Sequence, residues 1–250
     1  MSAEPLIRIK NVTKIFDLTD DVCEVFDGFN IDIHKNQFVC ILGHSGCGKS
    51  TLLRIIAGFE EVNEGAVIID NKVHDKPGKD VIMLFQSFEQ LLPWKTVIKN
   101  VAYPIFAVGK VKSKKEAVEC ASDILDEVGL SDFKDCYPHQ LSGGMKQRAA
   151  VARALALKPS ILLMDEPFAS LDEKNRREMQ ELTKNICSKY NMTIIFVTHS
   201  IEEAITLADR IIVIGSDSGN IKCDIENRYN INKDIETKKE MISVLTNIMI

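Results

Sequence analysis

The chain has 250 residues, a length that suits one large domain or two lobes with a shared core. Hydrophobic residues make up 45% of it and charged residues 27%, a globular composition that excludes a fibre and a disordered chain. The 31 basic and 36 acidic side chains give a net charge of −5, which argues against sequence-independent binding to nucleic acid. No run of about 18 apolar residues is present, so a membrane-spanning helix is not expected. The 7 cysteines form no Cys-x-x-Cys pair, which argues against a disulfide framework or a zinc site.

The first part of the chain is predicted to form β structure followed by a helix. Short β-rich runs between turn signals predict antiparallel strands at Leu6–Val12 and Val22–Ile33. The apolar run Phe38–Leu42 predicts a buried strand that ends at a glycine-rich loop. The segment Lys49–Ala57 then predicts a helix, which Gly58 ends.

The middle of the chain is predicted to add two strands and a helical lobe. The strands are expected at Gly65–Asp70 and Val81–Phe85. Helical patterning follows, with apolar residues at 3.6-residue spacing over Lys114–Val128 and an alanine-rich stretch over Gly143–Leu157. We therefore expect an inserted helical subdomain at approximately 87–158.

Three apolar runs in the last part of the chain predict a parallel sheet. The runs Ile161–Met164, Thr193–Val197 and Arg210–Ile214 are apolar on both faces and alternate with helical segments. The tail 216–250 is polar until a final helix, which is expected to place Ile242, Leu245 and Ile248 on one face. The fold class predicted is α/β, as a single domain over 1–250 with an N-terminal antiparallel β portion and a short C-terminal tail.

A glycine-rich loop between the predicted strand and helix carries the strongest motif. The segment Gly43-His-Ser-Gly-Cys-Gly-Lys-Ser50 matches Gly-x4-Gly-Lys-Ser. Its backbone N–H groups and the start of the next helix favour phosphate oxygens. Lys49 can bridge the β- and γ-phosphates of ATP, and the Ser50 hydroxyl can bind Mg²⁺. The predicted nucleotide-binding residues are Gly43, His44, Ser45, Gly46, Cys47, Gly48, Lys49, Ser50 and Thr51.

Two carboxylates end the predicted strand at Ile161–Met164. Asp165 suits a Mg²⁺ shell, because this hard cation prefers oxygen ligands and keeps several waters. Glu166 is placed to polarise or deprotonate an attacking water. A lone Asp-Glu pair is more often a surface feature, but its combination with a phosphate loop favours a catalytic role.

A third motif, Leu141-Ser-Gly-Gly-Met145, precedes Lys146-Gln-Arg148. With it, the sequence resembles the nucleotide-binding subunits of ATP-binding-cassette (ABC) transporters, from about Leu6 to Gly215. The family's motifs occur here in the family's order. The motifs are Walker A at 43–51, the Q-loop glutamine Gln86, the signature at 141–145, Walker B at 161–165, the D-loop at 169–172 and the switch histidine His199, with Phe16 as the aromatic residue before the phosphate loop.

The resemblance implies the P-loop NTPase fold of ABC ATPases and a role for each matched residue. Phe16 would stack on adenine, and Gln86 would help Ser50 and Asp165 to organise Mg²⁺. His199 would contact the γ-phosphate, and Asp172 would contact the opposite protomer. The catalytic set so implied is Glu166, His199, Lys49 and Gln86.

The signature motif predicts a second anion site. Ser142, Gly143 and Gly144 open a helix with bare N–H groups and one hydroxyl, a pattern that needs a phosphate. An ordinary capped helix is the plainer interpretation, although capping does not require two glycines. The resemblance implies that two copies pack head to tail, so that the signature of one contacts the γ-phosphate held by the other.

The motifs alone leave the use of the ATP open among three classes. The chain could serve an importer, a non-transport ABC ATPase of DNA repair or the ribosome, or a nucleotide-gated regulatory module. The segment between Gln86 and Leu141 has room for a compact helical lobe but not for a long coiled coil, and one cassette is present rather than two. Intact Glu166 and His199 argue against a regulatory module. The importer is therefore favoured, with the non-transport ATPase as the alternative.

Further similarity points to a branch of importers. The segments Leu91–Trp94 and Asp165–Phe168, with Met145, are similar to the nitrate/sulfonate/taurine branch. The apolar loop Phe88–Trp94 would receive a helix of the membrane subunit, unless it fills the core of the helical lobe. The resemblance thus implies that the partners are a second ATPase subunit, transmembrane permease subunits and, indirectly, an external solute-binding protein. No nucleic-acid partner is expected. The expected location is peripheral, at the cytoplasmic face of the cell membrane.

Overall fold

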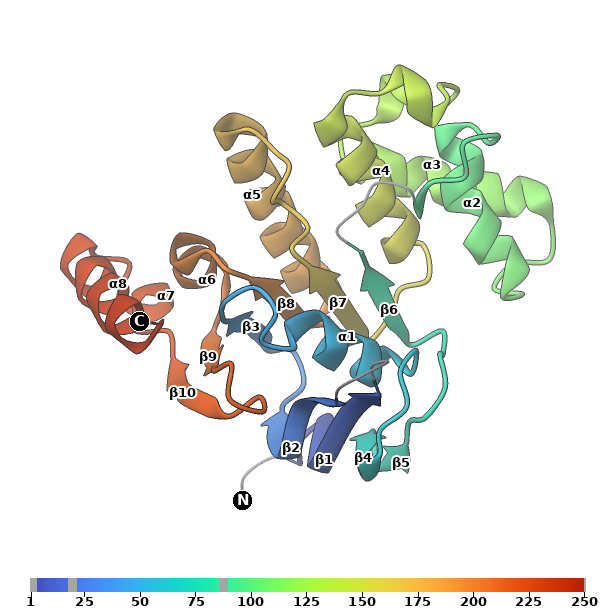
Figure 1. The fold of residues 1–250 in the computed structure, drawn as a ribbon. Helices are drawn as coiled ribbons and strands as arrows, with labels where there is room; N and C mark the ends of the chain where they lie inside the picture. Colours follow the sequence, from blue (N-terminus) through green and yellow to red (C-terminus); the bar gives the residue numbers. More distant parts are fainter. Residues whose placement is uncertain (1–3, 18–21, 86–89, 250) are drawn as a thin grey trace. The chain divides into compact units, whose positions relative to one another are not determined.

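The computed structural model describes residues 4–17, 22–85 and 90–249. The chain divides into two compact units, of which the first comprises Met1–Gly78 and Met192–Ile250 and the second Lys79–Asn191. The second unit therefore interrupts the first in sequence (Figure 1). The subdomain predicted at 87–158 lies within the second unit, and its boundaries and those of the tail at 216–250 stay predictions.

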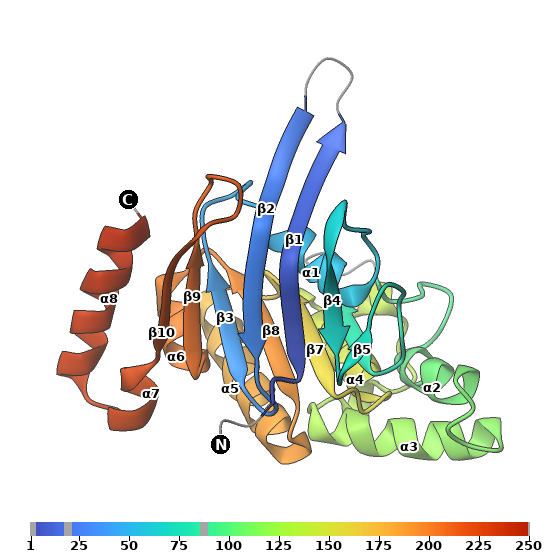
Figure 2. The same cartoon turned by 90° about the horizontal axis from the view of Figure 1, so that it is seen from below.

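An antiparallel sheet forms the start of the first unit, as predicted. Its strands are β1 (Ile7–Asp17), β2 (Val22–Ile33), β4 (Glu64–Ile69) and β5 (Lys72–Val73), in the order β2-β1-β4-β5. Strands β1 and β2 run side by side and extend beyond β4 (Figure 2). Strand β1 continues past the predicted end at Val12. Register irregularities near Asn11, which has a φ of 47°, interrupt the side-chain alternation there, so the alternating sequence pattern stops before the strand does.

The second group of strands in the first unit contains two of the three apolar runs predicted to form a parallel sheet, with β3 (Phe38–Leu42) between them. Strand β3 pairs in parallel with both β8 (Thr193–Thr198) and β9 (Arg210–Ile214). All five residues of β3 are buried, as the continuous apolar run predicts. Strand β10 (Ile221–Glu226), which was not predicted, adds to β9 in antiparallel orientation.

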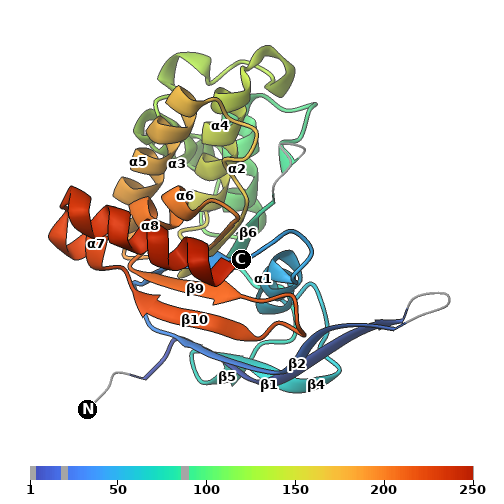
Figure 3. The ribbon, with the colours of Figure 1, turned by 60° about the vertical axis from the view of Figure 1, so that its left-hand side comes forward.

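Four helices accompany these strands in the described part of the first unit. They are α1 (Lys49–Ala57), α6 (Ile201–Leu207), α7 (Arg228–Asn232) and α8 (Ile235–Met249). Helix α8 packs against α6, α7 and β9 (Figure 3). Its buried residues are Met241 and Leu245, whereas Ile242 and Ile248, predicted on the same face as Leu245, are half-buried. The face that packs is thus turned slightly from the predicted one.

The second unit combines a strand pair with helices. Strands β6 (Val81–Leu84) and β7 (Ile161–Asp165) pair in parallel. Helices α2 (Val97–Ala107), α3 (Lys114–Glu127) and α4 (Gly143–Leu155) pack against one another, and α5 (Glu173–Tyr190) follows β7. Two short 3-10 turns, η2 (Ser131–Phe133) and η3 (Pro138–Gln140), join α3 to α4. Among the described helices of both units, none is long and apolar enough to cross a membrane.

Candidate functional site

The phosphate loop joins β3 to α1, where the sequence places it. Gly46 and Gly48 have φ angles of 85° and 95°, which side chains with a Cβ rarely adopt. At Gly48 an added Cβ would also lie 2.6 Å from Val25 Cγ1, so the loop needs glycine there. Helix α1 has no acidic residue in its first turn, so no carboxylate of that turn competes for its positive N-terminal end. The loop therefore has the backbone form of an anion site.

Lys49 lies inside this loop. Its side chain is 5% exposed, and its Nζ donates to the carbonyl oxygens of Gly43 at 2.9 Å and His44 at 2.7 Å. The ammonium group is thus held within the same turn whose N–H groups would bind phosphate. An anion at this position would meet a preorganised positive charge.

Two further loop residues have defined surroundings. Cys47 is 4% exposed, and its Sγ lies 3.9 Å from Lys49 Nζ. An added Cβ at Gly43 would lie 2.5 Å from Cys47 Sγ, so these residues are in close contact. The exposed ring of His44 is hydrogen-bonded to the carbonyl oxygen of Met249 in α8. The C-terminal helix and the phosphate loop are therefore in direct contact.

The predicted switch histidine lies at the end of β8. His199 is exposed, whereas Thr198 before it is 2% exposed. The Thr198 hydroxyl donates to Glu203 at 2.5 Å and accepts from the N–H of Ser200 at 3.0 Å. A buried hydrogen-bonded turn thus presents His199 outward.

The Glu203 carboxylate also affects a neighbouring thiol. Burial, and secondarily this carboxylate, raises the pKa of the Cys40 thiol in β3 well above its usual value.

Asp165 and Glu166 end β7 in the second unit. All residues of β7 are buried, including Asp165 at 8% exposure. Glu166 is half-buried and has a φ of 42°, in the left-handed region that non-glycine residues seldom occupy. Such strain persists only where the surrounding structure holds it, and it is common at functional sites.

A buried amide supports the segment after Glu166. Gln147 in α4 is 4% exposed, and its Nε2 donates to the carbonyl oxygen of Pro167. The helix that begins at the signature motif is thereby bonded to the residue next to the predicted catalytic glutamate. Sequence reasoning did not find this residue, although a glutamine on the apolar face of an alanine-rich helix is a usable signal.

The signature motif begins α4. The Ser142 hydroxyl accepts from the N–H of Met145 at 3.4 Å, so Ser142 caps the helix. Gly143 is exposed, and no atom would come within 4 Å of a Cβ there. At Gly144 an added Cβ would lie 3.1 Å from Asn175 Oδ1. The two glycines thus keep one side of the helix start open and the other close to α5.

The predicted D-loop aspartate caps α5. Asp172 accepts from the N–H of Asn175 at 2.9 Å and from the Asn175 side chain at 2.6 Å. These hydrogen bonds, that from the backbone N–H first, lower the pKa of the Asp172 carboxyl. Asn175 therefore lies between the signature helix and the D-loop, a link that the sequence pattern did not predict.

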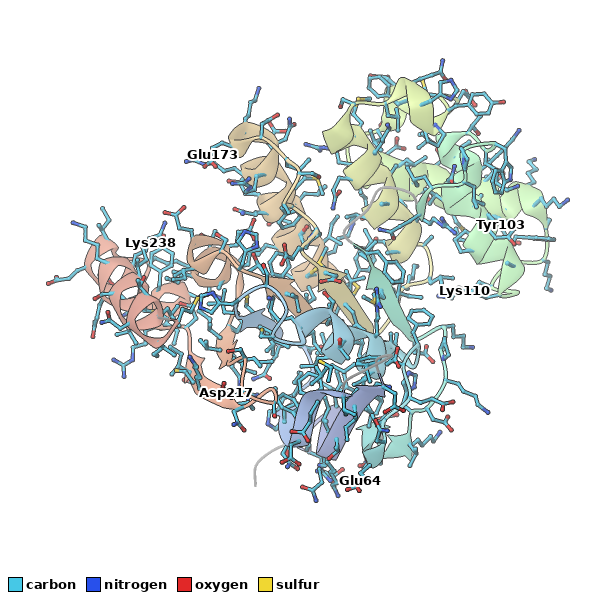
Figure 4. The ribbon with its side chains drawn as sticks, in the orientation of Figure 1. Glu64, Tyr103, Lys110, Glu173, Asp217 and Lys238 are labelled. Atoms are coloured by element: carbon cyan, nitrogen blue, oxygen red, sulfur yellow. The ribbon has the colours of Figure 1, made fainter. Side chains whose placement is uncertain are left out.

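The apolar loop before α2 is ordered by one buried amide. Asn100 is 0% exposed; its Oδ1 accepts from the N–H of Leu92 at 2.7 Å and its Nδ2 donates to Lys95 O at 3.0 Å. Leu91 is buried, whereas Trp94 is 70% exposed. Tyr103, labelled in Figure 4, is also exposed, and Lys95 Nζ lies 5.3 Å from its ring centroid. The two interpretations of this loop therefore apply to different residues. Leu91 is buried, as core filling predicts, and Trp94 is exposed, as a partner surface predicts.

Comparison with known proteins decides the family. Residues 26–169 match the family model described as ABC transporter. The aliphatic sulfonates import ATP-binding protein SsuB of Bacillus cereus is 42% identical, over 94% of this chain and 92% of that protein. The bicarbonate transport ATP-binding protein CmpD of Synechocystis sp. is 40% identical, over 83% and 73%. The chain belongs to the ABC transporter family.

A solved structure supports the same assignment. The dimeric post-hydrolysis state of an ATP-binding cassette bound to ADP and phosphate has a TM-score of 0.79 and 34% identity, over 89% of this chain and 99% of that one. This chain is accordingly an ATP-binding cassette with the P-loop NTPase fold of ABC ATPases, and its enzymatic activity is that of an ATPase.

The predicted residues of the cassette divide between the units. The first unit holds Phe16, the loop 43–51 and His199, and the second holds the signature, Asp165, Glu166 and Asp172. Gln86 and Phe88 lie outside the described residues. Phe16 is half-buried on β1, opposite Cys23 of β2. Glu203, which sequence reasoning missed, has a readable signal in Ser200-x-x-Glu203, the spacing of a helix capping box.

Proposed function

We propose that this cassette is the ATP-hydrolysing subunit of an importer of a small solute. The solute proposed is an anion of the nitrate, sulfonate or taurine type. The observation that carries the hydrolytic part of the proposal is Glu166, a half-buried carboxylate in a strained backbone next to Asp165, in a chain that also has an intact phosphate loop. The names of relatives for sulfonate import and bicarbonate transport support an anion as the cargo.

Nucleotide binding is assigned to the first unit. The loop N–H groups and Lys49 would hold the phosphates, and Phe16 would stack on the base. Because Lys49 is already held by two carbonyl oxygens of the loop, binding costs little side-chain ordering. Most of the rate enhancement would come from such fixed charges and dipoles, because phosphoryl transfer needs little covalent chemistry from the protein.

The chemistry of the residues proposed as ligands suits Mg²⁺. Ser50 and the buried Asp165 offer oxygen ligands, and in the described ranges no group of three His, Cys, Asp or Glu side chains forms a full metal cage. Mg²⁺ typically takes one or two protein ligands and completes its shell with phosphates and water. When bound, it would neutralise charge on the β- and γ-phosphates. Gln86 is proposed as a further ligand from the family resemblance.

Hydrolysis is assigned to Glu166 and His199. The Glu166 carboxylate would orient the attacking water and accept its proton. His199, exposed beyond the buried Thr198–Glu203 pair, would contact the γ-phosphate. The rigid turn below His199 would keep its ring in one position while nucleotide is exchanged.

A second copy of the chain is proposed to complete each site. The open side of the signature helix at Gly143 and the hydroxyl of Ser142 form an anion site that requires a phosphate from outside its own unit. In a head-to-tail dimer, two such signatures would contact two bound ATP molecules, and Asp172 would contact the partner.

The permease is proposed to bind at the apolar loop around Trp94, at the cytoplasmic face of the membrane. We would test this by purifying the tagged chain from detergent-solubilised membranes and identifying what accompanies it. The importer predicts a protein with several membrane helices, and the binding protein encoded with it would then be screened against sulfonates, nitrate and bicarbonate. Ribosomes, DNA or no partner, from a chain that hydrolyses ATP, would contradict the transport function.

Two single variants sharpen this experiment. W94A should reduce recovery of the permease, because Trp94 is 70% exposed beside the proposed contact. V73A is the matched control, because Val73 is also an exposed apolar residue, at 68%, but lies on β5 in the first unit. Equal recovery with both variants would place the permease contact elsewhere.

A further inference from the structure

Lys14 is a buried lysine in the strand that carries Phe16. It is 8% exposed, and its Nζ lies 2.7 Å from Glu60 Oε1 and donates to the carbonyl oxygen of Glu61 at 2.8 Å. The same ammonium lies 4.5 Å from the centroid of the Phe16 ring. A lysine that is both buried and fixed by two oxygens has one defined position, which distinguishes it from a solvated surface cation.

This position defines one face of the Phe16 ring. A cation within about 6 Å of a ring centroid is attracted to the face of the ring. The ring itself is half-buried, so part of it remains accessible. A planar base that stacks on Phe16 would use the face that the ammonium does not occupy. The ammonium would then hold the ring in the orientation that stacking needs.

The contacts of Lys14 also connect this ring to the phosphate loop. Glu60 and Glu61 follow the end of α1, the helix that begins at the phosphate loop. Asn63 strengthens the connection, since its Oδ1 accepts from Ile15 at 2.8 Å and its N–H donates to Thr13 at 2.9 Å. The segment after α1 is therefore bonded to β1 on both sides of Lys14. The base platform and the phosphate site thus keep a fixed separation.

We propose that Lys14 is a positioning residue for nucleotide recognition: with Glu60, it fixes the ring of Phe16 for stacking on the base and ties it to the helix of the phosphate loop. The inference rests on the proposed stacking role of Phe16. It predicts that Lys14 affects binding of the base but not binding of the phosphates.

The test compares a nucleotide with its phosphate portion alone. Isothermal titration calorimetry would measure the binding affinities of ADP and of inorganic pyrophosphate, neither of which this ATPase turns over. K14M, which keeps an apolar stem but removes the charge, should weaken ADP binding by about threefold to tenfold, the effect of leaving one side chain unfixed. Pyrophosphate binding should not change, and K14R, which keeps the cation, should restore ADP binding.

Further variants separate the possible failures. K14M/E60Q guards against misfolding caused by an unpaired Glu60, and it should reproduce the selective loss of ADP affinity. Unchanged ADP binding in K14M, or equal weakening of both ligands, would overturn the inference. If F16A loses ADP affinity while K14M does not, only the role of Lys14 fails. If F16A binds ADP like the parent, the proposed stacking role fails, and the inference fails with it.

Discussion

At the scale of single residues, Glu166 offers the sharpest test of the chemistry. Its φ of 42° is imposed by the buried strand and by the segment that Gln147 supports, so a substitution that preserves shape should leave the backbone in place. E166Q removes the base but keeps the size of the side chain and one of its two acceptor oxygens. We expect ATP binding to persist and hydrolysis to fall by about 10²- to 10⁴-fold, the usual worth of a general base.

Phosphate release and ATP binding would be measured on the same preparation of E166Q. E181Q is the matched control, because Glu181 is exposed on α5 in the same unit. Hydrolysis by E166Q within a few-fold of the parent would show that another group accepts the proton.

Cys47 gives a second prediction at this scale. Its thiol is buried in the phosphate loop, in close contact with Gly43 and 3.9 Å from Lys49 Nζ. An added maleimide group would occupy the space that phosphates need. We therefore expect ATP to protect Cys47 from N-ethylmaleimide, and modification to abolish hydrolysis, as measured by peptide mass spectrometry beside an ATPase assay.

Two other cysteines calibrate this labelling. Cys23 is exposed and should react equally with and without ATP. Burial raises the pKa of the Cys187 thiol to about 12, so it stays protonated and should not react near neutral pH. Full activity of protein modified at Cys47 would reduce this residue to a space-filling role.

At the scale of elements, local signals determined what could be predicted. Helix α1 and strands β2, β3 and β9 begin and end where the sequence predicts. Each is bounded by a glycine, a turn or an abrupt change of polarity, which act over a few residues. The phosphate loop belongs to the same group, because its function requires particular residues in consecutive positions.

Other elements were missed for different reasons. Strand β10 alternates apolar and charged residues over Ile221–Glu226, so its period of two was readable, but the run lies in a segment interpreted as a polar tail. Helix α2 contains Pro104, which argues against a helix although packing within the lobe overrides it. The amide of Gln147 depends on the backbone of Pro167, 20 residues along the chain, which no local pattern reveals. The amide of Asn100 has nearby partners at Leu92 and Lys95, but they are backbone groups and leave no mark in the sequence.

The C-terminal helix provides the prediction at this scale. Leu245 is 0% exposed, and it anchors α8 on the first unit next to the contact between Met249 and His44. L245A should lower the free energy of unfolding by about 2–5 kcal/mol, because it leaves a cavity in this packing. V244A is the control, since Val244 is 42% exposed. Urea denaturation would compare them, and equal midpoints would mean that α8 is not firmly docked.

At the scale of the whole molecule, carboxylates in both units predict that the folded protein loses stability at low pH. Hydrogen bonds from the Lys134 side chain, from the N–H of Asn175 and from the N–H of Thr237 lower the pKa values of Asp126, Asp172 and Asp234, respectively. The folded state therefore binds fewer protons than the unfolded state, so stability rises with pH. This contribution is complete above the ordinary carboxyl pKa of 3.8 and is lost as the pH falls through the lower folded values.

Melting temperatures from about pH 7 down to about pH 2 would reveal this loss. We expect a steep fall at the acid end and a shallower one in D126N, which cannot titrate at that position and loses its ion pair with Lys134. A melting temperature that stays level to the lowest pH would contradict the role of these carboxylates.

The interrupted first unit also sets the order in which the protein is made. Strand β3 has its two neighbours in β8 and β9, and about 150 residues separate Leu42 from Thr193. At about 5–20 residues per second, a ribosome needs roughly 8–30 s to supply β8 after β3. During that time a fully apolar strand has neither of its parallel partners. Strand β3, which leads into the phosphate loop, can therefore pair with β8 and β9 only after the whole of the second unit has been synthesised.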